Sequence, residues 1–424
     1  MAAAHVRSGG QPDGNFTRFD LVEIELSFIR SFPNDEQTLT AMVAEFGAQQ
    51  HVKVHLRKME WGTVWPELLT IASHGSGPDV SHIGGTWVSS LAKMNALRPF
   101  KADEIAGMGG AAAFMKPVWD STGLFEDERI WSIPWTGWIY LICYRKDLLE
   151  KIGVDGSQAF STIQELDKTI ERLKNSALDI PWLNPFVQAP YTDLLHIAAS
   201  WVWAAGGDLI NAAGTQVVFD SPKALDGLTL WLDTYRAVAP AHKALVPEDC
   251  SSLFQQGRAA AVLLDIQRAN TLLEDATDPL VRENLGTATL TNVPWVGSGN
   301  FVIWEHARES RERENAAVKL VSFLTSKDAN LRWKQFCGHM PARSDALAEV
   351  YPSENPLHAA MELAARQGRT YYNIPLWRRI EYQLSQALGA VVKEANEAPS
   401  KSSSSILRAH LEPLARRLNL TLST

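Results

Sequence analysis

The residue types that perform catalysis occur in this sequence without the spacing that catalysis needs. The 424 residues contain no GxSxG elbow, no HExxH, no phosphate-binding P-loop and no EF-hand loop. The segment GSGNF at 297–301 matches only part of a dinucleotide fingerprint, because the acidic residue that holds the ribose is missing about 20 positions further on. The carboxylates of FEDER at 125–129 lie between a turn and a strand, which is typical of a solvated turn. The sequence therefore indicates no catalytic site.

Metal-binding residue types give the same result. The eleven histidines are scattered, and no pair of them has metal-ligand spacing on one predicted helix face. The cysteines, Cys143, Cys250 and Cys337, are odd in number, lie far apart and lack the paired spacing of a zinc site. We expect them to be small core residues. No metal or cofactor is predicted.

Tryptophans at the ends of predicted strands and helices point to a different chemistry. An indole ring offers an apolar face to the C–H face of a sugar, and nearby polar groups can then bind the hydroxyls. In open α/β sheets, ligands bind outside the carboxyl ends of the strands, where such rings would lie. Core packing is the alternative for each ring, but the number of rings in such positions favours a ligand cleft. Of the fifteen tryptophans, those at such ends are Trp87, Trp135, Trp138, Trp201, Trp203 and Trp377.

The composition is that of a globular protein with two or three domains. Of the residues, 46% are hydrophobic and 21% are charged, and the formal net charge is -8. This charge disfavours nucleic acid or an anionic membrane as the main partner. No apolar run approaches the roughly 20 residues of a membrane span, and no signal peptide is visible. The expected location is therefore the cytoplasm, or outside it if an export signal has been removed, and residues 1–19 are expected to form a flexible leader.

The elements that must position the tryptophans alternate between strands and helices. Residues 21–29 predict a buried strand, the next segment has apolar residues at helical spacing, and VKVHLRKM at 52–59 predicts a second strand. This β-α-β order predicts parallel pairing. Thr162 and Glu165 form a capping-box pattern that starts another helix. From about 354 the chain is nearly all helix, with a break at 397–405. The fold class is therefore α/β with a helical C-terminal part.

The order of several motifs resembles the extracellular solute-binding proteins of carbohydrate ABC importers, the maltose-binding-like family. Each motif alone is moderately specific, but together they follow the family's order over residues 20–420. The motifs are WGTVWPELLTIASHGSGPDV, LAKMNALRPF, SIPWTGWIYLICYRKDLLEKIG, AAGGDLI followed by VVFDSPKALDGLTLWLDTY, LFQQGRAAAVLL, and NAAVKLVSFLTSKDANLRWKQFCGHMPARSDAL.

The resemblance implies two α/β lobes with a ligand cleft between them, the periplasmic-binding-protein-like fold. Placed on this sequence, lobe 1 would comprise residues 20–137 and 268–338, and lobe 2 residues 139–265 and 340–420. The chain would cross between the lobes near residues 138, 266 and 339.

The resemblance also implies a set of ligand-binding residues. Where many relatives have a Gly-Pro-Trp-like turn after AAAVLL, this chain has Asp265, Ile266 and Gln267, which removes one stacking ring and adds polar groups. The ligand's identity therefore cannot be copied from a relative. The residues expected in the cleft are Phe28, Arg30, Thr86, Trp87, Trp135, Trp138, Trp203, Asp265, Gln267, Gly297, Ser298 and Trp377.

The function that the resemblance implies is a monomeric, non-enzymatic receptor. It would capture a mono- or oligosaccharide and deliver it to the permease of an ABC importer, in the periplasm or at the cell surface. Three alternatives remain open. A carbohydrate-active enzyme would need two carboxyl groups flanking the scissile bond. An adaptor protein would have all its tryptophans in cores, and a cytoplasmic sugar sensor would lack an export signal.

Overall fold

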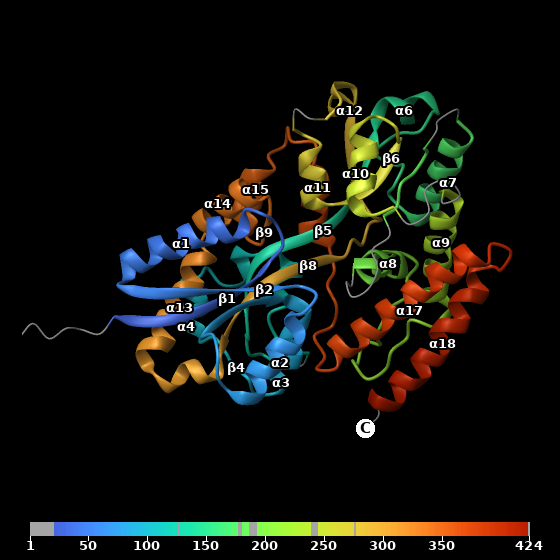
Figure 1. The fold of residues 1–424 in the computed structure, drawn as a ribbon. Coiled ribbons are helices and arrows are strands. Elements are labelled where there is room, and N and C mark those ends of the chain that lie inside the picture. Colours follow the sequence, from blue (N-terminus) through green and yellow to red (C-terminus); the bar gives the residue numbers. More distant parts are fainter. Residues whose placement is uncertain are drawn as a thin grey trace, which may run out of the picture.

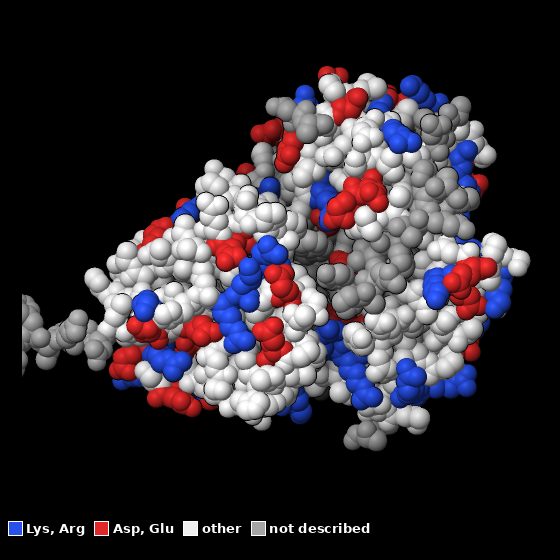
Figure 2. Space-filling model, in the orientation of Figure 1, with Lys and Arg blue, Asp and Glu red and all other residues white. Residues whose placement is uncertain are grey.

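The fold is described from a computed structural model (Figure 1), which covers residues 21–125, 127–176, 180–185, 193–238, 245–274 and 277–422. The leader predicted at 1–19 lies outside these residues. Two lobes lie side by side, with mixed groups of acidic and basic side chains on the face seen in Figure 2. This confirms the predicted two-lobed α/β class. In the part of the chain described, no helix is long and apolar enough to cross a membrane.

The first lobe is built on the predicted β-α-β unit. Strand β1 (Val22–Arg30) is followed by α1 (Asp35–Gln50) and β2 (Val52–Glu60), and the two strands pair in parallel. After α2 (Val64–His74), β3 (Val80–Gly84) pairs in parallel with the other side of β1. Because these strands are parallel, their carboxyl ends lie at one edge of the sheet. The buried face of α1 is the apolar stripe that predicted the helix, formed by Leu39, Met42, Val43 and Phe46.

Two long strands join the lobes. Strand β8 (Val296–Trp304) is antiparallel to β3 on one side and to β5 (Ile133–Arg145) on the other. The first half of β5 pairs with β8, and its second half pairs with β6 (Ala261–Asp265) and β7 (Leu285–Thr289). The strand order is β2-β1-β3-β8-β5-β6. Two short strands, β4 (Leu97–Arg98) and β9 (Met340–Pro341), pair with β8 and β5 respectively.

Helices dominate the second lobe. The cap predicted for α7 (Ile163–Lys174) is present, since the Thr162 side chain accepts a hydrogen bond from the Glu165 amide. Helices α8 (Asp193–Ala204) and α9 (Pro222–Val238) pack together. They form a second core with α17 (Trp377–Glu397) and α18 (Ser403–Leu422), the helical C-terminal part on the right of Figure 1. The break between α17 and α18 falls within the predicted loop at 397–405.

Shorter helices complete the two lobes, and all three cysteines are buried as predicted. These helices are α3 (Val88–Lys93), α4 (Ala102–Gly107), α5 (Lys116–Trp119), α6 (Lys146–Lys151), α10 (Pro247–Gln255), α11 (Ile266–Thr271), α12 (Pro279–Glu283), α13 (Arg311–Leu324), α14 (Lys327–Cys337), α15 (Ser344–Val350) and α16 (His358–Gln367).

The strand pairing differs from two of the predicted lobe boundaries. Strand β7 was expected in lobe 1 with residues 268–338, but it pairs with Leu141–Arg145 of β5, on the lobe 2 side. Helix α15 was expected in lobe 2 with residues 340–420, but it packs on α14 and thereby on lobe 1, which α14 joins through α1. Motif order alone could not place these segments, because a short strand shows its partner only in three dimensions.

Candidate functional site

A cavity of about 910 Å³ lies between the lobes, at the carboxyl ends of β1, β2 and β3. Its walls come from both lobes and from the strands that join them. Lobe 1 contributes residues 30–33, 60–62, 82 and 84–87. The joining strands and the segments beside them contribute residues 136, 138, 140, 295, 297–299 and 339. Lobe 2 contributes residues 185, 193, 196, 246–248, 264, 265, 268 and 378.

The structure brings together seven of the twelve residues predicted for the site. They come from five separate segments, and the cavity lies at the edge of the sheet that the strand-end argument selected. The seven residues on the cavity wall are Arg30, Thr86, Trp87, Trp138, Asp265, Gly297 and Ser298.

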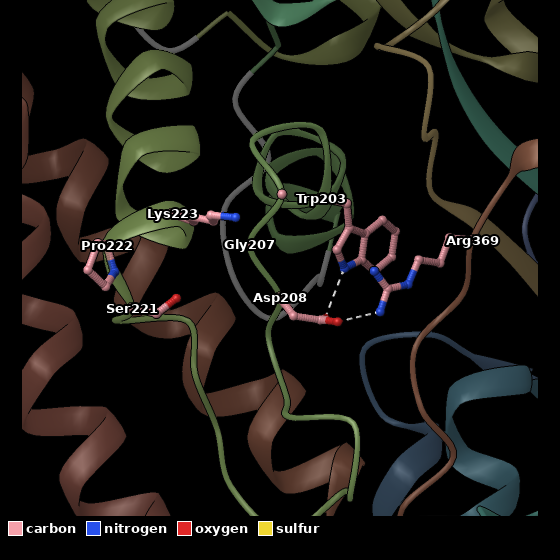
Figure 3. Close-up of a pocket in the computed structure, with 8 residues that line it drawn as sticks. Trp203, Gly207, Asp208, Ser221, Pro222, Lys223 and Arg369 are labelled. Atoms are coloured by element: carbon pink, nitrogen blue, oxygen red, sulfur yellow. Dashed lines mark hydrogen bonds and ion pairs between the residues drawn. The ribbon is translucent and has the colours of Figure 1, made fainter.

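The other five residues do not line this cavity, and four of them are large aromatic side chains in the cores. Phe28 and Trp135 are each 1% exposed in the core that includes lobe 1, where Trp135 stacks on Trp333 at 4.4 Å. Trp377 is 1% exposed and packs on Tyr371 in the second core. Trp203 is buried in that core and borders a different pocket (Figure 3). Gln267 is buried in the first turn of α11.

The direction of a side chain explains these differences. Trp135 lies where the register of β5 with β8 shifts, between Pro134 and Thr136, whereas Trp138 pairs with Gly297 in the regular part of the strand. Trp135 points into the core and the half-buried Trp138 into the cavity. Trp377 lies at the start of α17 and faces the other helices of the second lobe. A position near the end of an element therefore does not decide which way its ring points.

The lobe 1 wall contains an aromatic pair that sequence reasoning found only in part. Trp61 and Trp87 meet edge to face with their centroids 5.6 Å apart. The Trp61 indole N–H donates to Ser31 Oγ over 2.9 Å, which fixes the ring against the loop after β1. The Arg378 guanidinium lies 5.4 Å from the centre of the Trp87 ring. Trp61 directly follows β2, so the rule that selected Trp87 would also have found it.

A buried hydrogen bond between Asp35 and His339 shapes the loop after β1. Asp35, 1% exposed, accepts hydrogen bonds from the Ser31 and Phe32 amides, each over 2.9 Å, and from His339 Nε2 over 3.0 Å. Burial raises the pKa of Asp35, but the hydrogen bonds and charge of His339 and the two amides outweigh burial, so the pKa is lowered. The loop so fixed places Phe32 against Trp138, with stacked rings 6.5 Å apart. These two rings make a second aromatic surface in the cavity.

A third aromatic surface comes from the segment before β8. The Trp295 ring lies parallel to the His196 ring, with centroids 3.9 Å apart. His196 Nδ1 is 2.8 Å from the Tyr371 hydroxyl. Burial, together with the charge of Arg378, lowers the pKa of His196 to about 3, so its ring is neutral at physiological pH. Neither Trp295 nor His196 was predicted, because neither follows a strand.

A second neutral histidine lies at the edge of the lobe 1 sheet. His82 Nδ1 accepts a long hydrogen bond of 3.4 Å from the Ile29 amide, which leaves the ring proton on Nε2. Burial lowers the pKa of His82 to about 3. A Cβ atom at Gly299 would lie 2.4 Å from His82 Nε2, so only glycine fits beside this ring.

The charged groups on the wall have partners within the protein. Arg30 pairs with Glu60 at 3.4 Å, and Arg268 pairs with both Asp265 and Glu248. Asp265 also caps α11 by accepting hydrogen bonds from the Gln267 and Arg268 amides. Asp193 accepts a hydrogen bond from the Tyr140 hydroxyl. Arg378 lies 3.6 Å from Glu381, but its Nε and Nη1 atoms make no hydrogen bond with any described residue.

Burial and the charge of Asp265 raise the pKa of Asp193, although the Tyr140 hydrogen bond opposes them. The carboxylates of the wall are thus engaged with other side chains. Among the described residues, no group of three or more His, Cys, Asp or Glu side chains could hold a metal ion. The wall therefore combines apolar aromatic faces with neutral or internally paired polar groups, an environment suited to an uncharged ligand rich in hydroxyls.

Comparisons with known proteins agree with this architecture. A Brucella abortus protein named as a binding protein is 22% identical over 348 residues, 80% of each chain. The structure of the sugar-binding protein MalE from the phytopathogen Xanthomonas citri matches 95% of this chain and 98% of its own, with a TM-score of 0.76 and 20% identity. An ABC transporter solute-binding protein from Thermotoga lettingae, bound with α-D-tagatose, matches 95% of this chain and 100% of its own, with a TM-score of 0.71 and 20% identity.

These structural matches establish the fold. The family is shown by agreement in the sequence itself, over a segment that includes parts of both lobes. The family of bacterial extracellular solute-binding proteins matches residues 41–360, and this chain belongs to it.

Proposed function

We propose that this protein is a receptor that binds a neutral mono- or oligosaccharide between its lobes and delivers it to the permease of an ABC importer. The observation that carries the proposal is the interlobe cavity, whose wall presents aromatic pairs while its charges are paired internally. A charged ligand would have to compete with these existing ion pairs, whereas sugar hydroxyls can join them without breaking them.

The relatives support the same ligand class. One matching structure is of a sugar-binding protein, and another is of an ABC transporter solute-binding protein with a bound sugar. Both are too distant in sequence to fix the ligand of this chain. The paired charges, together with the neutral His82 and His196, argue for an uncharged saccharide over a sugar acid or sugar phosphate.

Closure of the lobes is the proposed binding mechanism. Wall residues such as Trp87 on one side and Asp265 on the other belong to different lobes, so a ligand that touches both stabilises a closed arrangement. The ligand shifts the equilibrium only by the contacts that it makes in the closed state and not in the open one. The closed receptor would then dock on the permease as a monomer, in the periplasm or at the cell surface.

An enzyme acting on carbohydrates is the competing function. The relatives are named as binding proteins and not as enzymes. Asp193 is bonded to Tyr140, and Asp265 to Arg268 and two backbone amides. A retaining or inverting glycosidase needs one carboxyl group free to protonate the leaving oxygen and a second one to act as nucleophile or base. Here that use would require breaking existing bonds.

The test is a thermal-shift screen of neutral mono- and oligosaccharides, with sugar acids and sugar phosphates as charged comparisons. Binding only to the folded state at 100 times the dissociation constant adds about 2.7 kcal/mol, or several degrees for lobes of this size. Calorimetry then gives the affinity of the best neutral sugar, and mass spectrometry checks that the sugar is unchanged. Cleavage, a preference for the charged sugars, or the absence of any shift would contradict the proposal.

A matched pair of variants locates the site. Trp138→Ala removes a half-buried ring of the cavity wall and should weaken sugar binding by about 1–3 kcal/mol, the range for an aromatic anchor. Trp231→Phe alters a tryptophan that is 1% exposed in the second core, and it should leave the affinity unchanged. Equal affinity losses in the two variants would argue against binding in this cavity.

A further inference from the structure

Three side chains on the second lobe form a cluster outside the ligand cavity, drawn in Figure 3 and called here the Arg369 cluster: Trp203, Asp208 and Arg369. Arg369 Nη2 pairs with Asp208 Oδ2 at 2.5 Å, and its guanidinium lies 4.7 Å from the centre of the Trp203 ring. The Trp203 indole N–H donates to Asp208 Oδ1 over 3.2 Å. Asp208 therefore contacts both the Arg369 guanidinium and the Trp203 indole, and the guanidinium is held by Asp208 and by the face of the Trp203 ring.

The backbone of Arg369 connects this cluster to the cavity wall. The Arg369 amide donates to the Pro294 carbonyl, and the Val296 amide donates to the Arg369 carbonyl, each over 2.9 Å. These two bonds form a parallel bridge opposite Trp295. The residue before Arg369 is Gly368, where a Cβ atom would lie 2.4 Å from the Val296 side chain. The two segments are therefore packed as closely as a glycine allows.

Trp295 itself has little room to move. Its amide donates to Ser200 Oγ over 2.9 Å, and its ring stacks on His196. On the side of β8, a Cβ atom at Gly297 would lie 2.2 Å from the Trp295 ring. A shift of the 294–296 backbone would therefore move the ring relative to His196, because the ring is packed closely on both sides.

From this chain of contacts we propose that Arg369 is a positioning residue for ligand binding: the Arg369 cluster, from outside the cavity, holds the bridge that sets the Trp295 ring in the cavity wall. The inference rests on the proposed function for its effect on affinity. The claim that the Arg369 cluster restrains the backbone of residues 294–296 does not depend on any ligand.

The first arm of the test is hydrogen exchange on the free protein. Arg369→Met removes the ion pair and the guanidinium and should speed exchange at the Val296 amide, which bonds to the Arg369 carbonyl. Asp208→Asn, a milder change that removes the partner charge, should act in the same direction. Arg236→Met is the matched control, since this half-buried arginine also lies in the second lobe and binds the Lys401 carbonyl at 2.8 Å, away from the cavity. It should leave Val296 exchange unchanged.

The second arm is a double-mutant cycle on the affinity for the best saccharide of the screen. Arg369→Met should weaken binding about 2- to 30-fold, the range for residues that act through a neighbour. In a Trp295→Ala background the same change should alter the affinity less than about 2-fold, since the ring it positions is gone. Unchanged exchange at Val296, or a full loss of affinity that persists without Trp295, would overturn the inference. Failure of the wild type to bind any saccharide would instead contradict the proposed function, and the exchange arm would still decide the hold on Trp295.

Discussion

The two neutral histidines of the cavity wall, His82 and His196, predict that the folded protein loses stability on acidification, at pH values above those at which most carboxylates titrate. Burial and the charge of His339 hold the pKa of His82 at about 3, against the opposing effects of Asp35 and the Ile29 amide. Burial and the charge of Arg378 do the same for His196. In the unfolded chain the pKa of each histidine returns to about 6.5. The unfolded state therefore binds more protons between these values, and stability must fall as the pH is lowered through this range.

The magnitude follows from the size of the shift. At pH 5 a histidine in the unfolded chain is almost fully protonated, whereas a folded one with a pKa of about 3 is not. Each histidine therefore lowers the free energy of unfolding by about 2 kcal/mol between pH 7 and pH 5, and the pair lowers it by about 4 kcal/mol. Asp193 and Glu381 act in the opposite direction, because burial raises the pKa of each carboxyl and their protonation favours the folded state. The net slope of the wild type will therefore be smaller than that of the histidines alone.

The assay isolates the histidines by difference. The free energy of unfolding is measured by urea titration at pH 7 and pH 5 for the wild type and for the double variant His82→Gln and His196→Gln. The variant should lose about 4 kcal/mol less than the wild type over this interval, whatever its stability at pH 7. Trp231→Phe, a core substitution that removes no titratable group, is the control and should leave the slope unchanged. Equal slopes for the wild type and the double variant would refute the assignment of two buried neutral rings.

Three further outcomes follow from the packing. Trp377→Ala should lower the free energy of unfolding by about 3–5 kcal/mol in urea titrations, because the ring is 1% exposed in the core. The sugar affinity measured by calorimetry should stay unchanged, and a loss of affinity without a loss of stability would show that Trp377 contacts the ligand. Gly297→Ala should weaken calorimetric sugar affinity and add about 1–3 kcal/mol of strain, because its Cβ would lie 2.2 Å from the Trp295 ring; wild-type affinity would show that the ring can move aside. Arg98→Met should cost about 3–5 kcal/mol of stability in the same titrations, because it leaves Glu104 and Glu314 beside a buried position without their cation, and a change below 1 kcal/mol would contradict this.

Much of the fold could be predicted because it depends on periodicity and caps that lie within one segment. The apolar spacing of α1 and the Thr162 cap of α7 each identify an element without reference to the rest of the chain. The pairing of β7 with the second half of β5 depends instead on residues far apart in sequence. No local pattern records such a partner, and the boundary near residue 268 was misplaced for that reason.

The site was predictable to the edge of the sheet but not to individual side chains. Arg30 is the last residue of β1 and Trp87 lies three positions after the end of β3, so the topology of the parallel strands places both at the cavity. His196 enters the cavity from the first turn of α8, and its place depends on how that helix rotates against the rest of the lobe. Trp203 and Trp377 share the aromatic character expected of a sugar site, yet tertiary packing turns both rings into the second core.

The position of β8 in the sheet has a consequence for how the chain matures. Strand β3 ends at Gly84, and the strand that covers its free side begins only at Val296. During synthesis, the first lobe therefore carries an open strand edge until about two thirds of the chain has been made. Contacts between such distant segments form slowly, and an uncovered edge is a site for aggregation. A product truncated before Val296 would retain that edge permanently, so the N-terminal half is not expected to yield a well-behaved fragment of the first lobe.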